Sequence, residues 1–263
     1  MMTPKNFDLY KFKITPNKIN SWLAERYLKG AGLMQFLQSG NKGQWGPAYR
    51  DLARLHQIVV KRNSCNILEF GVGWSTIVLA DALRLNEQRR NSLKQKSHVY
   101  QQAGNIRNAT HSFQVFSVDS SSKWIEACKE TIPPHLEKYI QLVYSPSEAG
   151  LFNGRACHFH KLLPDIVPDF IYLDGPNPKD VQGNVHGMTW QNTDRPVMAG
   201  DILLMEPILH RGTLVLIDGR NNNADFLANN LQRSWTIRHH KLDNFTTMEL
   251  RRSWRQVLRE KYL

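Results

Sequence analysis

Asn66-Ile-Leu-Glu69-Phe-Gly71-Val-Gly73-Trp-Ser75-Thr76-Ile-Val-Leu-Ala80 is the stretch of this 263-residue chain that decides its predicted fold. Residues 67–70 are mostly apolar and typical of a buried strand, and the apolar residues after Thr76 are typical of a helix. Gly71 and Gly73 allow backbone angles and close approaches that a side chain would forbid. Ser75 or Thr76 is expected to cap the helix, whose free N–H groups favour a polar or anionic ligand.

The alternation of apolar strands with helices continues along the chain. Further strands are predicted, in order, at 113–119, 140–144, 169–174, 213–218, 235–239 and 245–250, with helices at 121–131, 199–209 and 223–231. The last two strands are joined by a connection too short for a crossover helix, so they are expected to be antiparallel. The sequence therefore predicts an α/β fold: a doubly wound, mostly parallel, seven-stranded Rossmann-like sheet with the last strand antiparallel, plus N-terminal helices.

Three regions are expected along the chain. Residues 1–60 are predicted to form an N-terminal arm and helical cap, 61–250 the sheet domain, and 251–263 a basic C-terminal tail. Within the domain, residues 86–111 are rich in polar side chains, which is typical of an inserted, mobile loop. The helix before it is therefore expected to end near residue 85.

A second irregular segment is expected at 145–154, before a short strand that flanks the sheet at 155–160. His158 and His160 alternate onto one face of this strand, at a spacing compatible with a metal ion. Because no third ligand lies nearby in the sequence, two solvent-facing histidines are the expected arrangement.

The chain is basic and has the composition of a globular protein. Lys and Arg number 34 against 23 Asp and Glu, which gives a net charge of +11 and admits a nucleic acid, an anionic surface or an acidic substrate as partner. The basic residues are scattered, so a generally solvated basic surface is an equal alternative. The sequence shows no long apolar run and no leader-like start, so we expect a cytoplasmic protein without a membrane span. The three cysteines have no metal-binding spacing, and we expect them to be reduced thiols without disulfides.

Acidic residues stand at the ends of four predicted strands: Glu69, Asp119, Asp174 and Asp218. In an open α/β sheet the ligand lies beyond the carboxyl ends of the strands. Carboxylates grouped there need hydrogen-bonding or charged partners. A ligand with hydroxyls, an ammonium, a sulfonium or a metal ion would suit them.

Residues 68–76, Leu-Glu-Phe-Gly-Val-Gly-Trp-Ser-Thr, resemble the first motif of class I S-adenosylmethionine-dependent methyltransferases. Asp119 stands where that family places the acid that binds the ribose hydroxyls, and residues 169–175 resemble its fourth-strand motif. The resemblance extends over about residues 60–250. It implies S-adenosylmethionine as cofactor and a methyl transfer to an oxygen of a small molecule or saccharide.

The resemblance also implies site residues. The cofactor-binding residues would be Glu69, Gly71, Gly73, Ser75, Thr76, Asp119, Ser120 and Asp174. The expected catalytic residues are Asp174, His186 and Asp218, of which His186 is chosen for its place in the loop after the fourth strand and not from the resemblance. His186 is the expected base, because the ordinary pKa of histidine lies near neutrality.

Asp174, Asp218 and Asn221 are also similar to the metal-binding residues of divalent-cation-dependent O-methyltransferases, and such oxygen ligands suit magnesium or calcium. Here Gly219-Arg220 separates Asp218 from Asn221. Arg220 is expected to pair with an acidic substrate or with one of these acids. No metal ligand is therefore assigned, and a divalent cation stays open as an additional cofactor.

Three other functions are compatible with parts of the pattern. A nicotinamide-dependent dehydrogenase shares the opening motif, but Thr76 replaces its third glycine. An RNA or DNA methyltransferase would suit the charge of +11, although the fourth strand ends in Asp-Gly-Pro-Asn and lacks the motif of exocyclic-amine methylation. A catalytically silent, methyltransferase-like binding module is the third. Turnover on any acceptor distinguishes an enzyme from the module.

Overall fold

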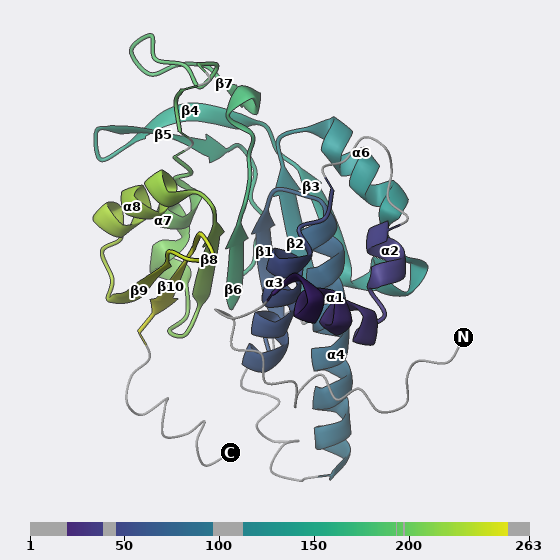
Figure 1. Cartoon of the computed structure of the whole chain (residues 1–263). Coiled ribbons are helices and arrows are strands. Elements are labelled where there is room, and N and C mark those ends of the chain that lie inside the picture. Colours follow the sequence, from purple (N-terminus) through teal and green to yellow (C-terminus); the bar gives the residue numbers. More distant parts are fainter. Residues whose placement is uncertain (1–19, 39–45, 97–112, 193, 197, 252–263) are drawn as a thin grey trace. The chain divides into compact units, whose positions relative to one another are not determined.

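The computed structural model describes residues 20–38, 46–96, 113–192, 194–196 and 198–251 (Figure 1). Seven strands form one sheet in the order β3-β2-β1-β6-β8-β10-β9. Their bounds are β1 Asn66–Phe70, β2 Gln114–Asp119, β3 Ile140–Tyr144, β6 Phe170–Leu173, β8 Leu214–Asp218, β9 Trp235–His240 and β10 Phe245–Leu250.

The strand directions confirm the predicted fold class. β6 runs parallel to β8, whereas β10 is antiparallel to both β8 and β9. The sheet is therefore mostly parallel with its last strand antiparallel, and helices precede β1. The physical reason is the short turn between β9 and β10, which leaves room only for a hairpin.

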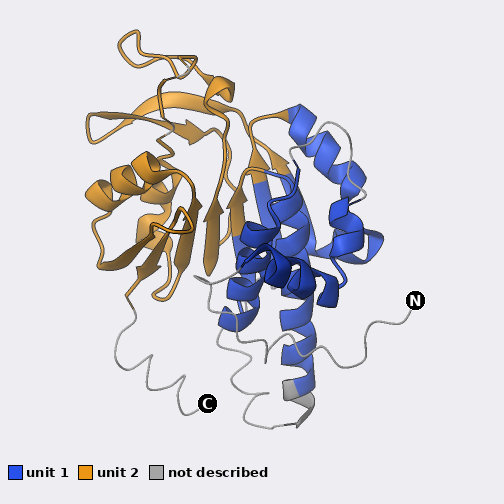
Figure 2. Cartoon of the chain, viewed as in Figure 1, with its two compact units in different colours: residues 1–67, 72–117, 122–142 blue, residues 68–71, 118–121, 143–263 orange. Residues whose placement is uncertain are grey.

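The chain divides into two compact units (Figure 2). Unit 1 comprises residues 1–67, 72–117 and 122–142, and unit 2 comprises residues 68–71, 118–121 and 143–263. β1 and β2 each begin in unit 1 and end in unit 2. The last residues of both strands therefore belong to the same unit as β6 and β8.

Unit 1 is mainly helical. Its elements are α1 Ser21–Gly30, α2 Met34–Gln38, α3 Tyr49–Arg62, α4 Trp74–Lys96, α6 Ser122–Thr131 and the 3-10 helix η2 Pro134–Tyr139. The Asn20 side chain caps α1 by accepting a hydrogen bond from the Leu23 N–H. The break between α1 and α2 includes Gly32 at φ +78°, a backbone angle that glycine adopts without strain.

The helix after the glycine turn is longer than expected. It was predicted to end near residue 85 and instead continues to Lys96, so the first part of the predicted 86–111 loop is helical. Asn86 explains part of this extension, because its buried amide donates to the carbonyls of Val59 and Ser64 at 3.1 and 3.0 Å. Residues 97–112 lie outside the described part of the chain, as do residues 1–19 of the arm and 252–263 of the tail.

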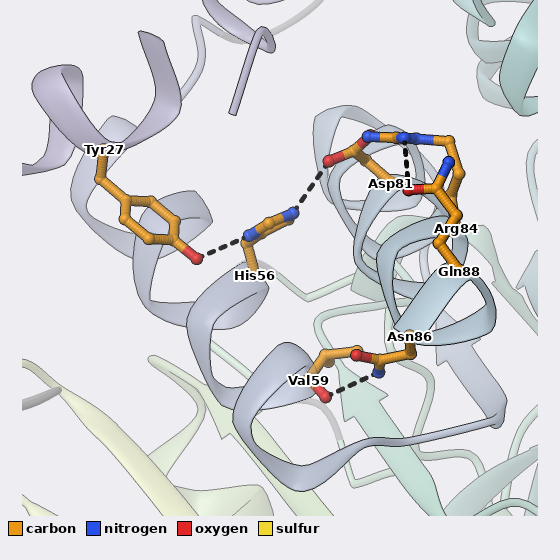
Figure 3. A network of polar contacts seen from close by, with 7 residues as sticks. All are labelled: Tyr27, His56, Val59, Asp81, Arg84, Asn86 and Gln88. Atoms are coloured by element: carbon orange, nitrogen blue, oxygen red, sulfur yellow. Dashed lines mark hydrogen bonds and ion pairs between the residues drawn. The ribbon is translucent and has the colours of Figure 1, made fainter. Parts of the chain in front are cut away.

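A buried polar network joins three helices of unit 1 (Figure 3). His56 on α3 bonds through Nδ1 to the Tyr27 hydroxyl on α1 and through Nε2 to Asp81 Oδ2 on α4, at 2.8 and 3.0 Å. Arg84 donates to the other Asp81 oxygen at 2.8 Å. The buried side chains of Tyr27, His56 and Asp81 thus all have hydrogen-bond partners, which offsets the cost of burying them.

Unit 2 contains a second, three-stranded sheet that the sequence did not indicate. Its order is β5-β4-β7, with β4 Ser147–Phe152, β5 Arg155–His160 and β7 Val181–Gln182. The prediction that 145–154 is a loop was therefore wrong, since most of it is β4. Residues 155–160 do form the expected strand, but this strand pairs antiparallel with β4 and does not join the seven-stranded sheet. β4 has no clear apolar alternation, because Ser147, Glu148 and Gly150 interrupt it.

The remaining elements of unit 2 are short helices. They are η3 Pro178–Asp180, α7 Asp201–Met205, η4 Glu206–Ile208 and α8 Asn221–Asn230. Cys65, Cys128 and Cys157 are all free, as expected. Among the described residues, no helix combines the length and apolarity needed to cross a membrane.

Candidate functional site

Two glycine turns meet at the carboxyl ends of β1 and β6. The Phe70 carbonyl accepts hydrogen bonds from the N–H groups of Asp174 and Gly175, at 3.0 and 2.6 Å. A Cβ atom on Gly175 would lie 2.6 Å from the Gly71 nitrogen, and one on Gly71 would lie 3.0 Å from the Gly175 nitrogen. Gly71 also has φ +98°. The backbones touch, so neither position has room for a side chain.

Asp119 ends β2 as a buried acid in the same unit. Its side chain accepts a hydrogen bond from the Ser121 N–H at 2.8 Å, and its carbonyl accepts from the Ser145 N–H at 2.9 Å. Next to it, the Ser120 hydroxyl oxygen is buried without a hydrogen-bond partner among the described residues. A buried hydroxyl in this state is costly, and a ligand hydroxyl would satisfy it.

Glu69 lies on β1 two residues before the turn. Its side chain is fully buried. A carboxylate at such a position is kept only where the surrounding groups or a ligand compensate it. Glu69 belongs to the same compact unit as Asp119, Asp174 and Asp218.

Tyr172 on β6 is a site residue that the sequence analysis missed. Its hydroxyl donates to Asp218 Oδ2 at 3.0 Å. Burial, and then the charges of Asp174 and Asp218, raise the pKa of Tyr172 well above its ordinary value, so the hydroxyl stays a donor. The available signal was a tyrosine inside an otherwise apolar strand, since a buried tyrosine hydroxyl requires a partner.

Arg220 confirms the expectation that it pairs with an acid. Its Nη2 donates to the Asp174 carbonyl, its Nη1 donates to the Pro176 carbonyl at 3.2 Å, and its Nε lies 3.8 Å from Asp174 Oδ1. Burial lowers the pKa of Arg220, and the nearby Asp174, Tyr172 and Asp218 oppose this change. The guanidinium thus spans the cis Gly175–Pro176 peptide, which follows β6.

Asp174, Asp218 and Asn221 do not fit a divalent cation as they stand. Asp174 faces the Arg220 guanidinium, Asp218 accepts from the Tyr172 hydroxyl, and the Asn221 amide donates to Asn244 Oδ1 at 3.1 Å. Within the described residues, no group of three or more His, Cys, Asp or Glu side chains is arranged to hold a metal ion.

His186 lies apart from these contacts. It is exposed at the tip of a turn closed by two hydrogen bonds between Val185 and Met188, with φ +50° at His186 and +81° at Gly187. Among the described residues, the side-chain partners of Asp174 and Asp218 include Arg220 and Tyr172, and His186 is not one of them. Its role as base stays a prediction.

Gly73, Ser75 and Thr76 belong to unit 1. The Thr76 hydroxyl accepts a hydrogen bond from the Gly73 N–H at 3.2 Å, just before α4 begins at Trp74. This contact satisfies one of the free N–H groups at the helix start, as a capping side chain does. The predicted cap is therefore confirmed for Thr76.

His158 and His160 were expected to face solvent, and this was wrong. Both are buried, His158 fully and His160 with 6% of its surface exposed. His160 Nδ1 lies 3.0 Å from Asp201 Oδ2, and His158 Nδ1 lies 3.1 Å from the Ser147 hydroxyl. Burial, with the nearby His160 and Arg220, lowers the pKa of His158 to about 3, so this imidazole is neutral. The cause is that β5, an edge strand of the three-stranded sheet, is covered by α7.

A surface groove of about 360 Å³ lies beside the start of α8. It is lined by amide, imidazole and charged side chains: Asn221, Asp225, His239, His240, Lys241, Asn244 and Phe245. The His240 and Phe245 rings stack with centroids 4.1 Å apart. Planar rings beside amide groups are a suitable surface for a hydroxyl-rich small molecule.

Comparisons with known proteins give structural likenesses alone. No protein-family model matches the chain, and no curated protein matches it. The SAH-bound methyltransferase PaMTH1 of Podospora anserina is 11% identical, with 89% of this chain and 98% of that chain covered and a TM-score of 0.48. An O-methyltransferase of Bacillus cereus in complex with SAH is 14% identical, with coverages of 89% and 92% and a TM-score of 0.41. The O-methyltransferase TomG of Streptomyces achromogenes, in complex with SAM, is 14% identical, with the same coverages and a TM-score of 0.42. Likenesses this distant do not identify a function.

Proposed function

We propose that the protein is an S-adenosylmethionine-dependent methyltransferase that transfers a methyl group to an oxygen of a small molecule or saccharide. The observation that carries the proposal is the end of β2, where the buried Asp119 carboxylate stands beside the unpartnered Ser120 hydroxyl. One ribose hydroxyl would supply the partner that the Ser120 hydroxyl lacks, and its neighbour would donate to the Asp119 carboxylate. The first-motif resemblance of residues 68–76 points to the same cofactor.

The expected cofactor-binding residues before β6 would each have a part in holding such a cofactor. Asp119 and Ser120 would hold the ribose, while Gly71 and Gly73 would let the backbone approach and Glu69 would fix the turn. Ser75 and Thr76 would order the start of α4. The bound cofactor would supply an electrophilic methyl on a positively charged sulfur.

The acceptor side is assigned to the ends of β6 and β8. Asp174 and Asp218 would orient the acceptor hydroxyl, and His186 would remove its proton after the exposed turn closes on the acceptor. The groove beside α8 would hold the rest of the acceptor, with its stacked His240 and Phe245 rings against a sugar or similar ring. Positioning of donor and acceptor provides most of the rate in such a displacement.

Calorimetric titration of S-adenosylmethionine and S-adenosylhomocysteine tests the cofactor. We expect both to bind the wild type, and Asp119→Ala to weaken binding by about 1.5–3 kcal/mol, the typical value of a hydrogen bond to a charged group. Asp165→Ala, at an exposed position between β5 and β6, is the matched control and should bind like the wild type. Absence of binding by the folded wild type would sink the proposal.

Methyl transfer from labelled cofactor to a panel of saccharides and hydroxylated metabolites tests the acceptor. Loss of a general base lowers turnover by about 10²–10⁴. We therefore expect His186→Asn to reduce kcat by that order on the best acceptor, with cofactor affinity unchanged. An unchanged kcat would remove His186 from the mechanism and leave Asp174 as the candidate base.

Nucleic-acid methylation is the second candidate function, and the net charge of +11 favours it. Binding through phosphate contacts falls steeply with salt. Methylation of RNA or DNA, together with such a salt dependence, would replace the small-molecule acceptor. Cofactor binding without turnover on either class would instead indicate a silent binding module.

A further inference from the structure

We propose that Arg220 takes the place of a divalent cation beside Asp174, so that the site works without a metal ion. Arg220 lies between Asp218 and Asn221 in the sequence, at the start of α8. The inference rests on the proposed function only in assigning these residues to a methyl-transfer site. Metal binding itself is measured on the protein without cofactor or acceptor.

The strand register brings the relevant residues to one place. β6 and β8 are parallel neighbours, with Leu173 opposite Ile217, so Asp174 and Asp218 follow at equivalent positions. The guanidinium of Arg220 reaches this end of β6. It lies 3.8 Å from Asp174 Oδ1 and bonds to the carbonyls of Asp174 and Pro176.

Of the oxygen atoms that a cation would use, Asp218 Oδ2 already accepts a hydrogen bond and Asp174 Oδ1 lies near a positive charge. Arg220 stands at Asp174, and the Tyr172 hydroxyl donates to Asp218 at 3.0 Å. The Asn221 amide donates to Asn244, whose backbone carbonyl in turn accepts from the Gly219 N–H at 2.8 Å. A cation entering here would be repelled by the Arg220 guanidinium and would have to displace the Tyr172 hydroxyl from Asp218, and both effects weaken its binding.

The net charge of the site with Arg220 differs from the net charge it would have with a divalent cation. Two carboxylates and one guanidinium leave one negative charge, whereas two carboxylates and a divalent cation would leave none. One negative charge favours the positive sulfonium of the proposed cofactor. A guanidinium also has a fixed, planar set of N–H donors that can bond to two backbone carbonyls at once. A spherical metal ion has no such directional donors.

Arg220 is thus a positioning residue for the turn after β6. That turn packs backbone to backbone on Gly71, where the Phe70 carbonyl accepts from Asp174 and Gly175. Holding the carbonyls on both sides of Gly175 keeps this packing in register. Arg220 therefore supplies both the positive charge beside Asp174 and the hydrogen bonds that position the turn after β6.

Binding of Mn²⁺, followed by electron paramagnetic resonance of the free ion, tests the inference. We expect Mn²⁺ binding to the wild type to lie below the detection limit, and Arg220→Ala to bind Mn²⁺ at least about tenfold more tightly than that limit, which corresponds to about 1.4 kcal/mol. Arg220→Lys, which keeps the charge, should stay without metal. Arg238→Ala is the matched control, because it removes an exposed arginine of β9 and should behave like the wild type.

Circular dichroism checks that each variant folds, and Arg220→Gln replaces Arg220→Ala if the alanine variant does not. Strong Mn²⁺ binding by the wild type, or no gain in either neutral variant, would overturn the inference. A gain of equal size in Arg220→Lys would also contradict it, since charge would then play no part. These outcomes are separate from those of the proposed function, which is tested by the binding of S-adenosylmethionine and by methyl transfer.

Discussion

Gly71 and Gly175 show how single residues govern the proposed site. Each lacks the room for a Cβ atom because the other glycine's backbone is in contact. Gly73 differs, since a Cβ atom there would meet nothing within 4 Å. The three glycines look alike in the sequence, but packing constrains only two of them.

Gly175→Ala should destabilise the protein by about 1–3 kcal/mol, the usual cost of an overpacked position. The added methyl would lie 2.6 Å from the Gly71 nitrogen, and backbone cannot move as a flexible side chain does. The midpoint of urea unfolding measures the change. Gly73→Ala is the control and should keep the wild-type midpoint, whereas an unchanged midpoint for Gly175→Ala would show that the two turns do not touch.

At the scale of elements, the packing of α1, α3 and α4 in unit 1 depends on a polar contact as well as on apolar side chains (Figure 3). Burial alone would raise the pKa of Asp81, but the hydrogen bonds and charges of His56 and Arg84 outweigh it and hold the pKa below the ordinary 3.8. The ionised form is therefore the one that the folded state stabilises.

Asp81→Asn should reduce the free energy of unfolding by about 3 kcal/mol near neutral pH, because it leaves buried partners of a charge uncompensated. A lowered native pKa adds stability above the unfolded value and loses it as pH falls. The difference between wild type and variant should therefore be constant above pH 5 and shrink as pH falls through 3.8.

Chemical denaturation at several pH values measures this dependence. Asp225→Asn, at an exposed position on α8, is the control and should show no comparable loss. The difference in the free energy of unfolding between wild type and Asp81→Asn should not be the same at pH 3 as at neutral pH. If it were, this contact would not stabilise the ionised form of Asp81.

At the scale of the whole molecule, a ligand that binds only the folded chain must raise its thermal stability. At a hundred times its Kd the added stability is about 2.7 kcal/mol. We expect S-adenosylhomocysteine to raise the Tm with the logarithm of its concentration, and NAD to leave it unchanged. A shift with NAD in place of S-adenosylhomocysteine would favour the dehydrogenase alternative.

Much of the fold followed from local pattern. The apolar strands and their acidic ends were predictable because a buried strand leaves a continuous apolar run, and the antiparallel last pair followed from the short connection of residues 241–244. β4 was not predictable, because its polar and glycine residues acquire their strand conformation by pairing with β5. The end of α4 at Lys96 was missed because Asn86 is held by the distant Val59 and Ser64 carbonyls.

The sequence by itself determined the order of the elements and the glycine turn of residues 66–80, together with the acids Asp119, Asp174 and Asp218 at strand ends. Only the tertiary structure decided what these acids face. Two interactions depend on the register of β6 against β8. They are the hydrogen bond from the Tyr172 hydroxyl to Asp218 and the hydrogen bonds from Arg220 to the turn after β6. Register between strands about 40 residues apart is set by packing of the whole sheet, and no local pattern contains it.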